Sequence, residues 1–251
     1  MILNDKFVFI HLPKAGGSFI HNYLKNNFGE DHPIDQRCWH YPISYVKRKR
    51  PRFKDVFSFG AIRSPFSWYV SWWAFNTQRA RRTKPIWSYK GIAVPEFEQS
   101  VQNIFNHKGT VPFPVDEGQN EIDFSAIHDL DIGLYSYFFY HMFCDGKQKL
   151  LLDKVIILEK ITEQFPEMFE ENIFPLSSKQ VTHLGRCATA KVNSSTHEPW
   201  PSYWTDELLD LILHKDRLFF ELFDEYRDEA HHLSVRKGYH RKAAILERNS
   251  A

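Results

Sequence analysis

The stretch FIHLPKAGGSFIHNYL, residues 9–24, joins an apolar run to a helical pattern through a turn that holds a lysine and two glycines. Residues 6–12 (KFVFIHL) are rich in β-forming apolar side chains. The apolar residues after the turn recur at helical spacing: Phe19, Ile20, Tyr23, Leu24 and Phe28. A strand, a glycine turn and a helix start gather backbone N–H groups at the positive end of a helix dipole. The stretch therefore predicts an anion site in an α/β fold.

The order of residues in this turn differs from that of the nucleotide triphosphatase loop. That loop reads G-x-x-x-x-G-K-[ST], with the lysine after the last glycine, whereas here Lys14 comes first and Gly16, Gly17 and Ser18 follow. Glycines let a backbone approach an anion closely, and Lys14 adds a mobile positive charge. Taken alone, the turn fits an anion site and a plain strand-to-helix turn with a solvent-facing lysine equally well.

Composition limits the domain count and the recruitment of partners. The 251 residues are 43% hydrophobic and 16% aromatic, which suffices for one sizeable core, so we expect residues 1–251 to form a single domain. The formal net charge of +1 excludes a global field that recruits nucleic acid or an anionic membrane. Any anion must therefore be held by local clusters of side chains.

Further apolar strands, at residues 55–62 and 154–159, alternate with helical patterns. Pro65 suits the first turn of a helix over about 65–82, and Thr205 opens another helix with an acidic first turn. Strands that alternate with helices form parallel sheets. The pattern predicts an α/β, P-loop-like three-layer fold with a central parallel β-sheet flanked by helices.

Three other segments lack a strand pattern. Residues 109–120 predict a loop, and residues 175–203 carry several Pro, Ser and Thr without a clear period. Residues 131–143 (DIGLYSYFFYHMF) are rich in aromatic side chains and predict a buried helix. A helix that lines a substrate pocket is the alternative for this last segment.

The cysteines and the N-terminal residues indicate the cellular compartment in which the protein works. Cys38, Cys144 and Cys187 lie far apart, are odd in number and include no C-x-x-C pair. This favours free thiols in a reducing compartment over a zinc site or a disulfide framework. The polar residues 4–6 precede a short apolar run, which is neither a signal peptide nor a spanning segment. We expect a cytoplasmic protein without stable membrane insertion.

A second candidate anion site lies in RSPFSWYVS, residues 63–71. Arg63 closes a strand, and Ser71 follows in the second turn of the next helix. We expect the Ser71 hydroxyl to return to the strand end, so that arginine and hydroxyl grip one phosphate from two sides. For either residue alone, a surface arginine and a neutral helical serine are the simpler interpretation.

Together the two patterns resemble a known family. F-[IV]-x-x-P-K-x-G-[GT]-[ST] after the first strand, with R-x-P-x-x-x-x-x-S after a later one, is similar to sulfotransferases that use 3′-phosphoadenosine-5′-phosphosulfate (PAPS). The closest resemblance is to carbohydrate sulfotransferases related to heparan sulfate 2-O-sulfotransferase. It implies in-line transfer of a sulfuryl group from PAPS to an acceptor hydroxyl, with 3′-phosphoadenosine-5′-phosphate (PAP) as the product.

The resemblance also assigns the donor site. In the family the first turn holds the 5′-phosphosulfate, and the arginine and serine hold the 3′-phosphate. In this chain those positions are Lys14, Ala15, Gly16, Gly17, Ser18, Phe19, Arg63 and Ser71. Residues 182–193 (THLGRCATAKVN) resemble a later loop near the 3′-phosphate, in which Arg186 and Thr189 match best. Ala15 stands where many members have a hydroxyl residue, and Gly17 where some have serine.

Sulfuryl transfer needs a base and relief of charge on the leaving phosphate. The resemblance gives the second role to Lys14 and places the catalytic histidine before the arginine strand, where CWHYPI contains His40. Histidine suits because its ordinary pKa lies near 6.5; His32 is the neighbouring alternative. The donor's sulfate carries less charge than a terminal phosphate, so we expect no metal.

The acceptor is expected to be a hydroxyl-bearing glycan or other small molecule. A basic run, KRKRPR at 47–52, could draw a polyanionic glycan toward the site, or could be a nuclear signal or a solvated loop. Two other functions are weighed against the enzyme. A P-loop nucleotide kinase would place the lysine behind the glycines, and a non-catalytic module would bind a nucleotide or glycan without turnover.

Overall fold

A four-stranded sheet with the order β1-β2-β3-β6 forms the centre of the molecule. The structure, a computed structural model, describes residues 1–29, 40–79, 91–116, 119–189, 197–229 and 232. Strand β2 pairs in parallel with β3, and β3 with β6, whereas β1 is antiparallel to β2. The strands are β1 (Ile2–Leu3), β2 (Val8–Ile10), β3 (Ser58–Ile62) and β6 (Lys154–Ile157). The expected α/β fold with a central, mostly parallel sheet is confirmed.

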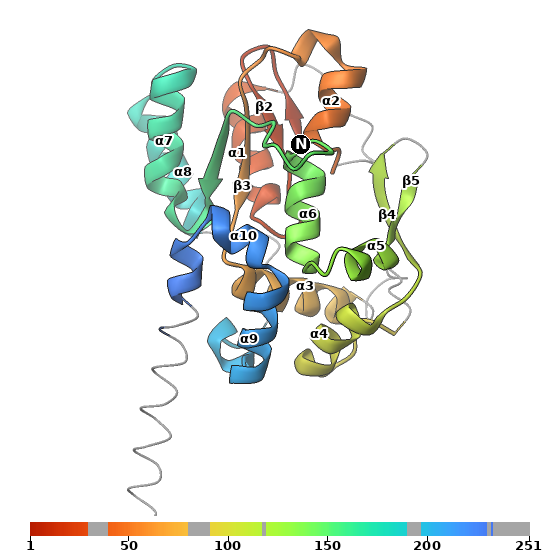
Figure 1. The fold of residues 1–251 in the computed structure, drawn as a ribbon. Helices are drawn as coiled ribbons and strands as arrows, with labels where there is room; N and C mark the ends of the chain where they lie inside the picture. The colour runs from red at the N-terminus through yellow and green to blue at the C-terminus, as the bar shows by residue number, and fades with distance from the viewer. Residues whose placement is uncertain (30–39, 80–90, 117–118, 190–196, 230–231, 233–251) are drawn as a thin grey trace, which may run out of the picture.

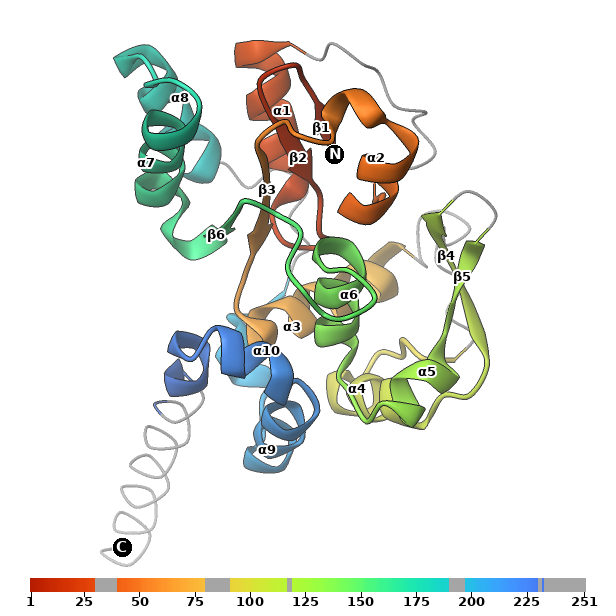
Figure 2. The same cartoon turned by 45° about the horizontal axis from the view of Figure 1, so that its top comes forward.

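Helices cover both faces of this sheet (Figures 1 and 2). Side chains alternate between the faces of a strand, so Phe9 joins one buried cluster and its neighbours Val8 and Ile10 join the other. The first cluster includes side chains of α1 (Gly17–Phe28), α7 (Ile161–Asn172) and α8 (Ser178–Thr189). The second includes side chains of α2 (Ile43–Lys49), α3 (Pro65–Arg79) and α6 (Leu134–Phe143).

The parallel strands deliver their carboxyl ends to one edge of the sheet. Strand β2 leads to α1, β3 leads to α3, and β6 leads through the 3₁₀ turn η2 (Leu158–Lys160) to α7. Ligands of open α/β sheets bind outside the carboxyl ends of the strands. The residues that follow Ile10, Ile62 and Ile157 are therefore the ones to search for a site.

Other helices agree with the sequence patterns. Pro65 begins α3, as expected, and the far end of the expected 65–82 helix lies outside the described residues. Thr205 caps α9 (Asp206–Lys215), because its hydroxyl accepts the Leu208 N–H at 3.2 Å. Helix α6 is buried along most of its length, which confirms the buried-helix interpretation. The remaining helical elements are η1 (Pro51–Phe53), α4 (Phe97–Asn106), α5 (Phe124–Asp129), η3 (Trp200–Tyr203) and α10 (Arg217–Leu222).

Two expectations about irregular segments are wrong. Residues 109–120 are not a loop, because β4 (Thr110–Asp116) and β5 (Gln119–Asp123) pair as an antiparallel hairpin. Prolines suggested a loop, but a two-stranded hairpin has only edge strands, which tolerate a residue without an N–H.

Residues 175–203 are not irregular throughout either, since α8 occupies residues 178–189. Gln180 accepts the Ser177 N–H at 2.9 Å, and the Gln180 N–H lies 3.4 Å from the Ser177 hydroxyl. This is a capping box, a recognised start signal for a helix. Among the described residues, none of the helices has the length and apolarity that crossing a bilayer requires.

Candidate active site

The turn between β2 and α1 has an unusual backbone. Lys14 has φ 63° and Gly16 has φ 72°, both in the left-handed region. A non-glycine residue held there costs on the order of 1–3 kcal/mol, and such strain collects at functional sites. Glycine is required at position 16 for a second reason, because a Cβ there would overlap the Leu158 side chain.

This turn leaves backbone donors open at the start of α1. Within the described residues, the N–H groups of Gly16, Gly17 and Ser18 have no hydrogen-bond acceptor, and Gly16 caps the helix without a side-chain bond. The Phe19 and Ile20 N–H groups, by contrast, are turned back to the Gly16 carbonyl. Three open donors at the positive end of a 12-residue helix form a site for an anion.

Side chains from the β3–α3 segment hold the turn in place. The Trp68 indole N–H donates to the Pro13 carbonyl at 2.7 Å, and Arg63 Nη1 donates to the Lys14 carbonyl at 3.1 Å. Both carbonyls are thereby tied back toward α3. Trp68 is wholly buried, so its role is in the core and in supporting this turn.

The Lys14 side chain extends toward α3. Its Nζ lies 4.0 Å from the centroid of the Phe75 ring, a cation–π contact. Lys14 is thus present at the turn, as expected, with its ammonium group resting on an aromatic face. A cation held this way keeps its charge and can be drawn to an anion by a change of side-chain rotamer.

Two histidines lie beside the turn. His40 Nδ1 is 2.9 Å from the His11 carbonyl oxygen, and the two ring centroids are 4.5 Å apart. Because a carbonyl only accepts, the proton of neutral His40 is on Nδ1 and the lone pair is on Nε2. Burial lowers the pKa of His40 to about 4, and the same cause lowers the pKa of His11 well below its ordinary value. His32 lies outside the described residues.

Arg63 follows β3 and is largely enclosed. Its Nε donates to the Ser67 hydroxyl at 2.9 Å, in the first turn of α3, so the hydroxyl that it reaches lies one helical turn before Ser71. Ser71 is buried in the same helix, and no Arg63–Ser71 hydrogen bond occurs among the described residues. Burial lowers the pKa of Arg63, while nearby Glu159 opposes this. Ser67 was missed because only the spacing to Ser71 matched a known pattern.

Carboxylates converge on the residue after Arg63. Glu159, at the end of β6, accepts the Ser64 N–H at 3.0 Å and the Tyr226 hydroxyl at 3.0 Å. Glu229 accepts the Ser64 hydroxyl at 2.5 Å. Burial raises the pKa of Glu229. The sequence patterns gave no hint of these contacts, because residues 64, 159 and 229 are far apart in the chain.

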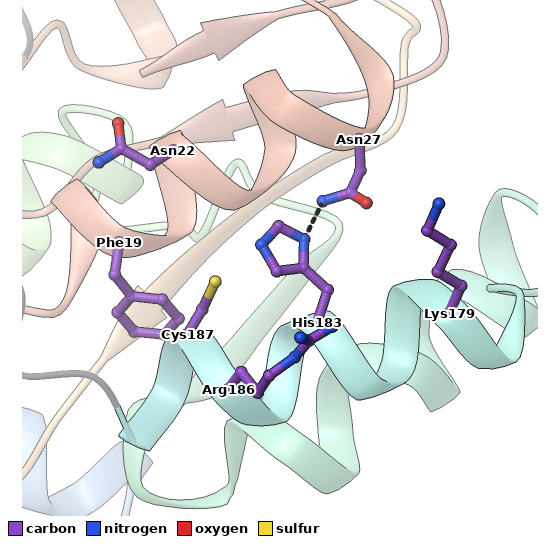
Figure 3. Close-up of a pocket in the computed structure, with 7 residues that line it drawn as sticks. All are labelled: Phe19, Asn22, Asn27, Lys179, His183, Arg186 and Cys187. Atoms are coloured by element: carbon purple, nitrogen blue, oxygen red, sulfur yellow. Dashed lines mark hydrogen bonds between the residues drawn. The ribbon is translucent and has the colours of Figure 1, made fainter.

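A pocket of about 550 Å³ lies between α1 and α8 (Figure 3). It is lined by Phe19, Asn22, Asn27, Lys179, His183, Arg186 and Cys187. This volume is typical of ligand pockets, and the lining carries two cationic side chains and no carboxylate. Phe19 and Arg186 thus line one cavity. Thr189 instead donates its hydroxyl to the Arg186 carbonyl at 3.0 Å in its own helix.

The structure brings several assigned residues to one sheet edge and leaves others apart. Lys14, the open N–H groups of residues 16–18, Arg63 and His40 surround the end of β2, and Ala15 is buried beneath them. Phe19 connects this edge to the pocket that Arg186 lines. Within the described parts of the chain, no three His, Cys, Asp or Glu side chains are grouped closely enough to hold a metal ion.

We compared the chain with known families, curated proteins and solved structures. No protein-family model and no curated protein sequence matches the chain. A similar solved structure is that of mouse sulfotransferase SULT7A1 complexed with PAP, with a TM-score of 0.41 and 13% sequence identity over 94% of this chain and 90% of the other. We therefore argue function from the side chains and open backbone groups of this chain.

Proposed function

We propose that this protein is a sulfotransferase that moves a sulfuryl group from PAPS to an acceptor hydroxyl, and that the acceptor is a carbohydrate, as the sequence resemblance implies. The observation that carries the proposal is the junction at the first turn of α1. The N–H groups of residues 16–18 are open there, and the next residue, Phe19, lines a pocket of about 550 Å³.

PAPS would bind with its phosphate end at the start of α1 and its adenosine in the pocket. The 5′-phosphate accepts hydrogen bonds from the N–H groups of Gly16, Gly17 and Ser18. The Phe19 ring offers a surface on which the adenine stacks. Stacking of a base on an aromatic side chain is worth about 1–3 kcal/mol. Arg186 lines the same pocket and supplies a positive charge for a phosphate group. Ala15 is buried in the turn. Thr189 remains a predicted contact of the nucleotide.

Arg63 and Ser71 are proposed to hold the 3′-phosphate. The guanidinium of Arg63 bonds the Ser67 hydroxyl and the Lys14 carbonyl in the free protein, and the charges of Glu159 and Glu229 raise its pKa against the effect of burial. A hydrogen bond between this guanidinium and a phosphate would be charge-assisted and therefore strong. The site is therefore expected to distinguish strongly between 3′-phosphorylated and dephosphorylated nucleotides.

The chemical step would use two side chains. Lys14 leaves the Phe75 ring and stabilises the negative charge that develops on the oxygen bridging phosphate and sulfur. His40 Nε2 accepts the proton of the attacking hydroxyl, while its Nδ1–H remains on the His11 carbonyl. The sulfuryl group passes from phosphate oxygen to acceptor oxygen in line, so positioning and electrostatics provide the catalysis. No metal ion is required in this scheme.

The basic run after His40 is folded onto the body of the protein. Residues 47–52 form α2 and η1 rather than an open loop. Lys47 donates to the Leu151 carbonyl at 2.8 Å, and Arg52 pairs with Asp5 at 2.5 Å. The exposed cations between them, Arg48, Lys49 and Arg50, form a positive surface near the starts of β2 and β6, whereas His40 bonds the His11 carbonyl at the carboxyl end of β2.

Titration calorimetry with PAP tests the donor site. We expect metal-independent binding that weakens at least tenfold for adenosine 5′-monophosphate, because the 3′-phosphate contact is lost. Preference for ATP with magnesium would instead support a nucleotide kinase. Lys14→Ala should bind PAP but lose turnover with PAPS, whereas the control Lys25→Ala, in the last turn of α1, should retain both. PAP binding with no sulfuryl transfer to any glycan would support the non-catalytic module.

A further inference from the structure

We infer that the His11 imidazole is an additional ligand of the 5′-phosphosulfate group, donating from Nε2 to the anion held at the start of α1. This inference rests on the proposed function. It assigns to His11 a contact that the sequence analysis gave only to the residues of the turn itself.

The first observation is the contact between His11 and Gly17. A Cβ at position 17 would overlap the Cδ2 and Nε2 atoms of the His11 ring. The imidazole edge therefore occupies the space that a side chain at position 17 would fill. Gly17 is one of the three residues whose N–H groups are open. The His11 ring, which comes from the end of β2, therefore lies beside the anion site in the space next to the Gly17 backbone.

The second observation is that the ring nitrogens of His11 have no hydrogen-bond partner among the described residues. Only 5% of the residue is exposed, and Nδ1 is completely buried without a partner among the described residues. Nε2 also has no partner there, but it is not one of the completely buried atoms. A buried polar ring with neither nitrogen satisfied costs stability unless a ligand completes it.

The tautomer follows from these environments. Orphaned buried N–H groups are rarer than under-satisfied acceptors, so the single proton of neutral His11 belongs on Nε2, the nitrogen on the Gly17 side. Burial and the neighbouring His40 both keep the ring neutral by lowering its pKa. A neutral ring in this tautomer presents one N–H to the anion site beside the three backbone donors.

Two substitutions separate this contact from packing. His11→Leu keeps an apolar side chain of similar bulk but removes the N–H, and His11→Gln places an amide Nε2–H near the position of the imidazole Nε2–H. His21→Leu is the matched control, because His21 is also buried and bonds the Met1 carbonyl at 3.2 Å, away from the turn. Thermal unfolding and far-ultraviolet circular dichroism of each variant check that the fold is retained.

The probes are PAP and adenosine 3′-monophosphate, which lacks the 5′-phosphate. We expect His11→Leu to weaken PAP binding roughly tenfold, since a hydrogen bond to a charged group is lost, and to leave adenosine 3′-monophosphate binding unchanged. His11→Gln should recover most of the PAP affinity, and His21→Leu should match the wild type. Unchanged PAP binding by His11→Leu, or equal losses for both probes, would overturn the inference. If the wild-type protein itself does not favour PAP, the proposed function fails first.

Discussion

The carboxyl ends of β2 and β3 lie side by side, yet three backbone N–H groups that follow β2 are left without acceptors in the described chain, whereas the polar groups that follow β3 are hydrogen-bonded. After β2, the N–H groups of residues 16–18 have no acceptor within the described chain, and Lys14 holds a left-handed backbone. After β3, Arg63 bonds Ser67 and the Lys14 carbonyl, and Ser64 bonds two carboxylates. One strand end is left open and strained, whereas the other is closed by its own contacts.

This difference separates ligand binding from support. The open backbone donors after β2 gain their partners only when an anion binds, so they contribute little to the stability of the free protein. The β3 end satisfies its groups in the free protein, and its arginine also fixes the neighbouring turn through the Lys14 carbonyl. Changes at Arg63 should therefore affect both folding and binding, and changes at Lys14 mainly turnover.

The largest effect is expected for Arg63→Met. It removes the hydrogen bonds that Arg63 donates to the Ser67 hydroxyl and the Lys14 carbonyl. Hydrogen bonds from a charged group are worth about 1.5–3 kcal/mol each, so the loss of unfolding free energy should be on the order of 3 kcal/mol. Urea denaturation measures the loss, and calorimetry should show that PAP binding is lost with it. Arg63→Lys keeps the charge and should cost about 1 kcal/mol, the value of one hydrogen bond. Equal, small losses for both variants would show that the hydrogen bonds of Arg63 do not stabilise the β3 end.

The next effect is expected for Gly17→Ala. The added methyl group overlaps the His11 ring, and overpacking of a filled site costs typically about 1–3 kcal/mol. The shifted imidazole should also weaken PAP binding. Gly185→Ala is the control, because a Cβ at this α8 position meets no neighbour and should raise stability by about 0.5–1 kcal/mol. Normal stability and normal PAP affinity of Gly17→Ala would contradict the crowded geometry.

The same contrast explains what could be predicted from the sequence. The β2 turn is local: strand, turn and helix follow within twenty residues, so Lys14, Gly16, Gly17 and Ser18 could be read as an anion site, and the parallel sheet followed from the alternation of strands and helices. The position of Arg63 at a strand end could be predicted for the same reason.

The partners of Arg63 could not be read in this way. Glu159, Glu229 and the Lys14 carbonyl come from separate elements, and only the fold brings them to one place. The hydroxyl at Ser67 was overlooked in favour of Ser71. The α1–α8 pocket was equally hidden, because its second wall is a helix in a segment read as irregular. The Ser177–Gln180 capping box was the available signal for that helix.

A smaller effect is expected at Lys14, where strain and charge can be separated. Lys14→Gly and Lys14→Ala both remove the ammonium group and should lose turnover alike. Only glycine relieves the left-handed backbone, for which other residues pay about 1 kcal/mol, so Lys14→Gly should be the more stable variant by about that amount in urea denaturation. If the alanine variant is equally stable, the turn relaxes and Lys14 carries no strain.

The smallest effect is expected from pH. A base must be unprotonated, and burial lowers the pKa of His40 to about 4, so kcat/KM should change by less than about twofold between pH 5 and pH 7; an ordinary histidine would give roughly a twentyfold fall. The unfolded protein takes up protons on this histidine near its ordinary pKa of about 6.5, whereas the folded protein does so only near 4, so the contribution of His40 to stability decreases as pH falls through that interval. The rate profile of wild type beside His40→Ala measures the first effect. A fall in kcat/KM near pH 6.5 would contradict this prediction. It would mean either that another residue is the base or that His40 is exposed to solvent when the donor is bound.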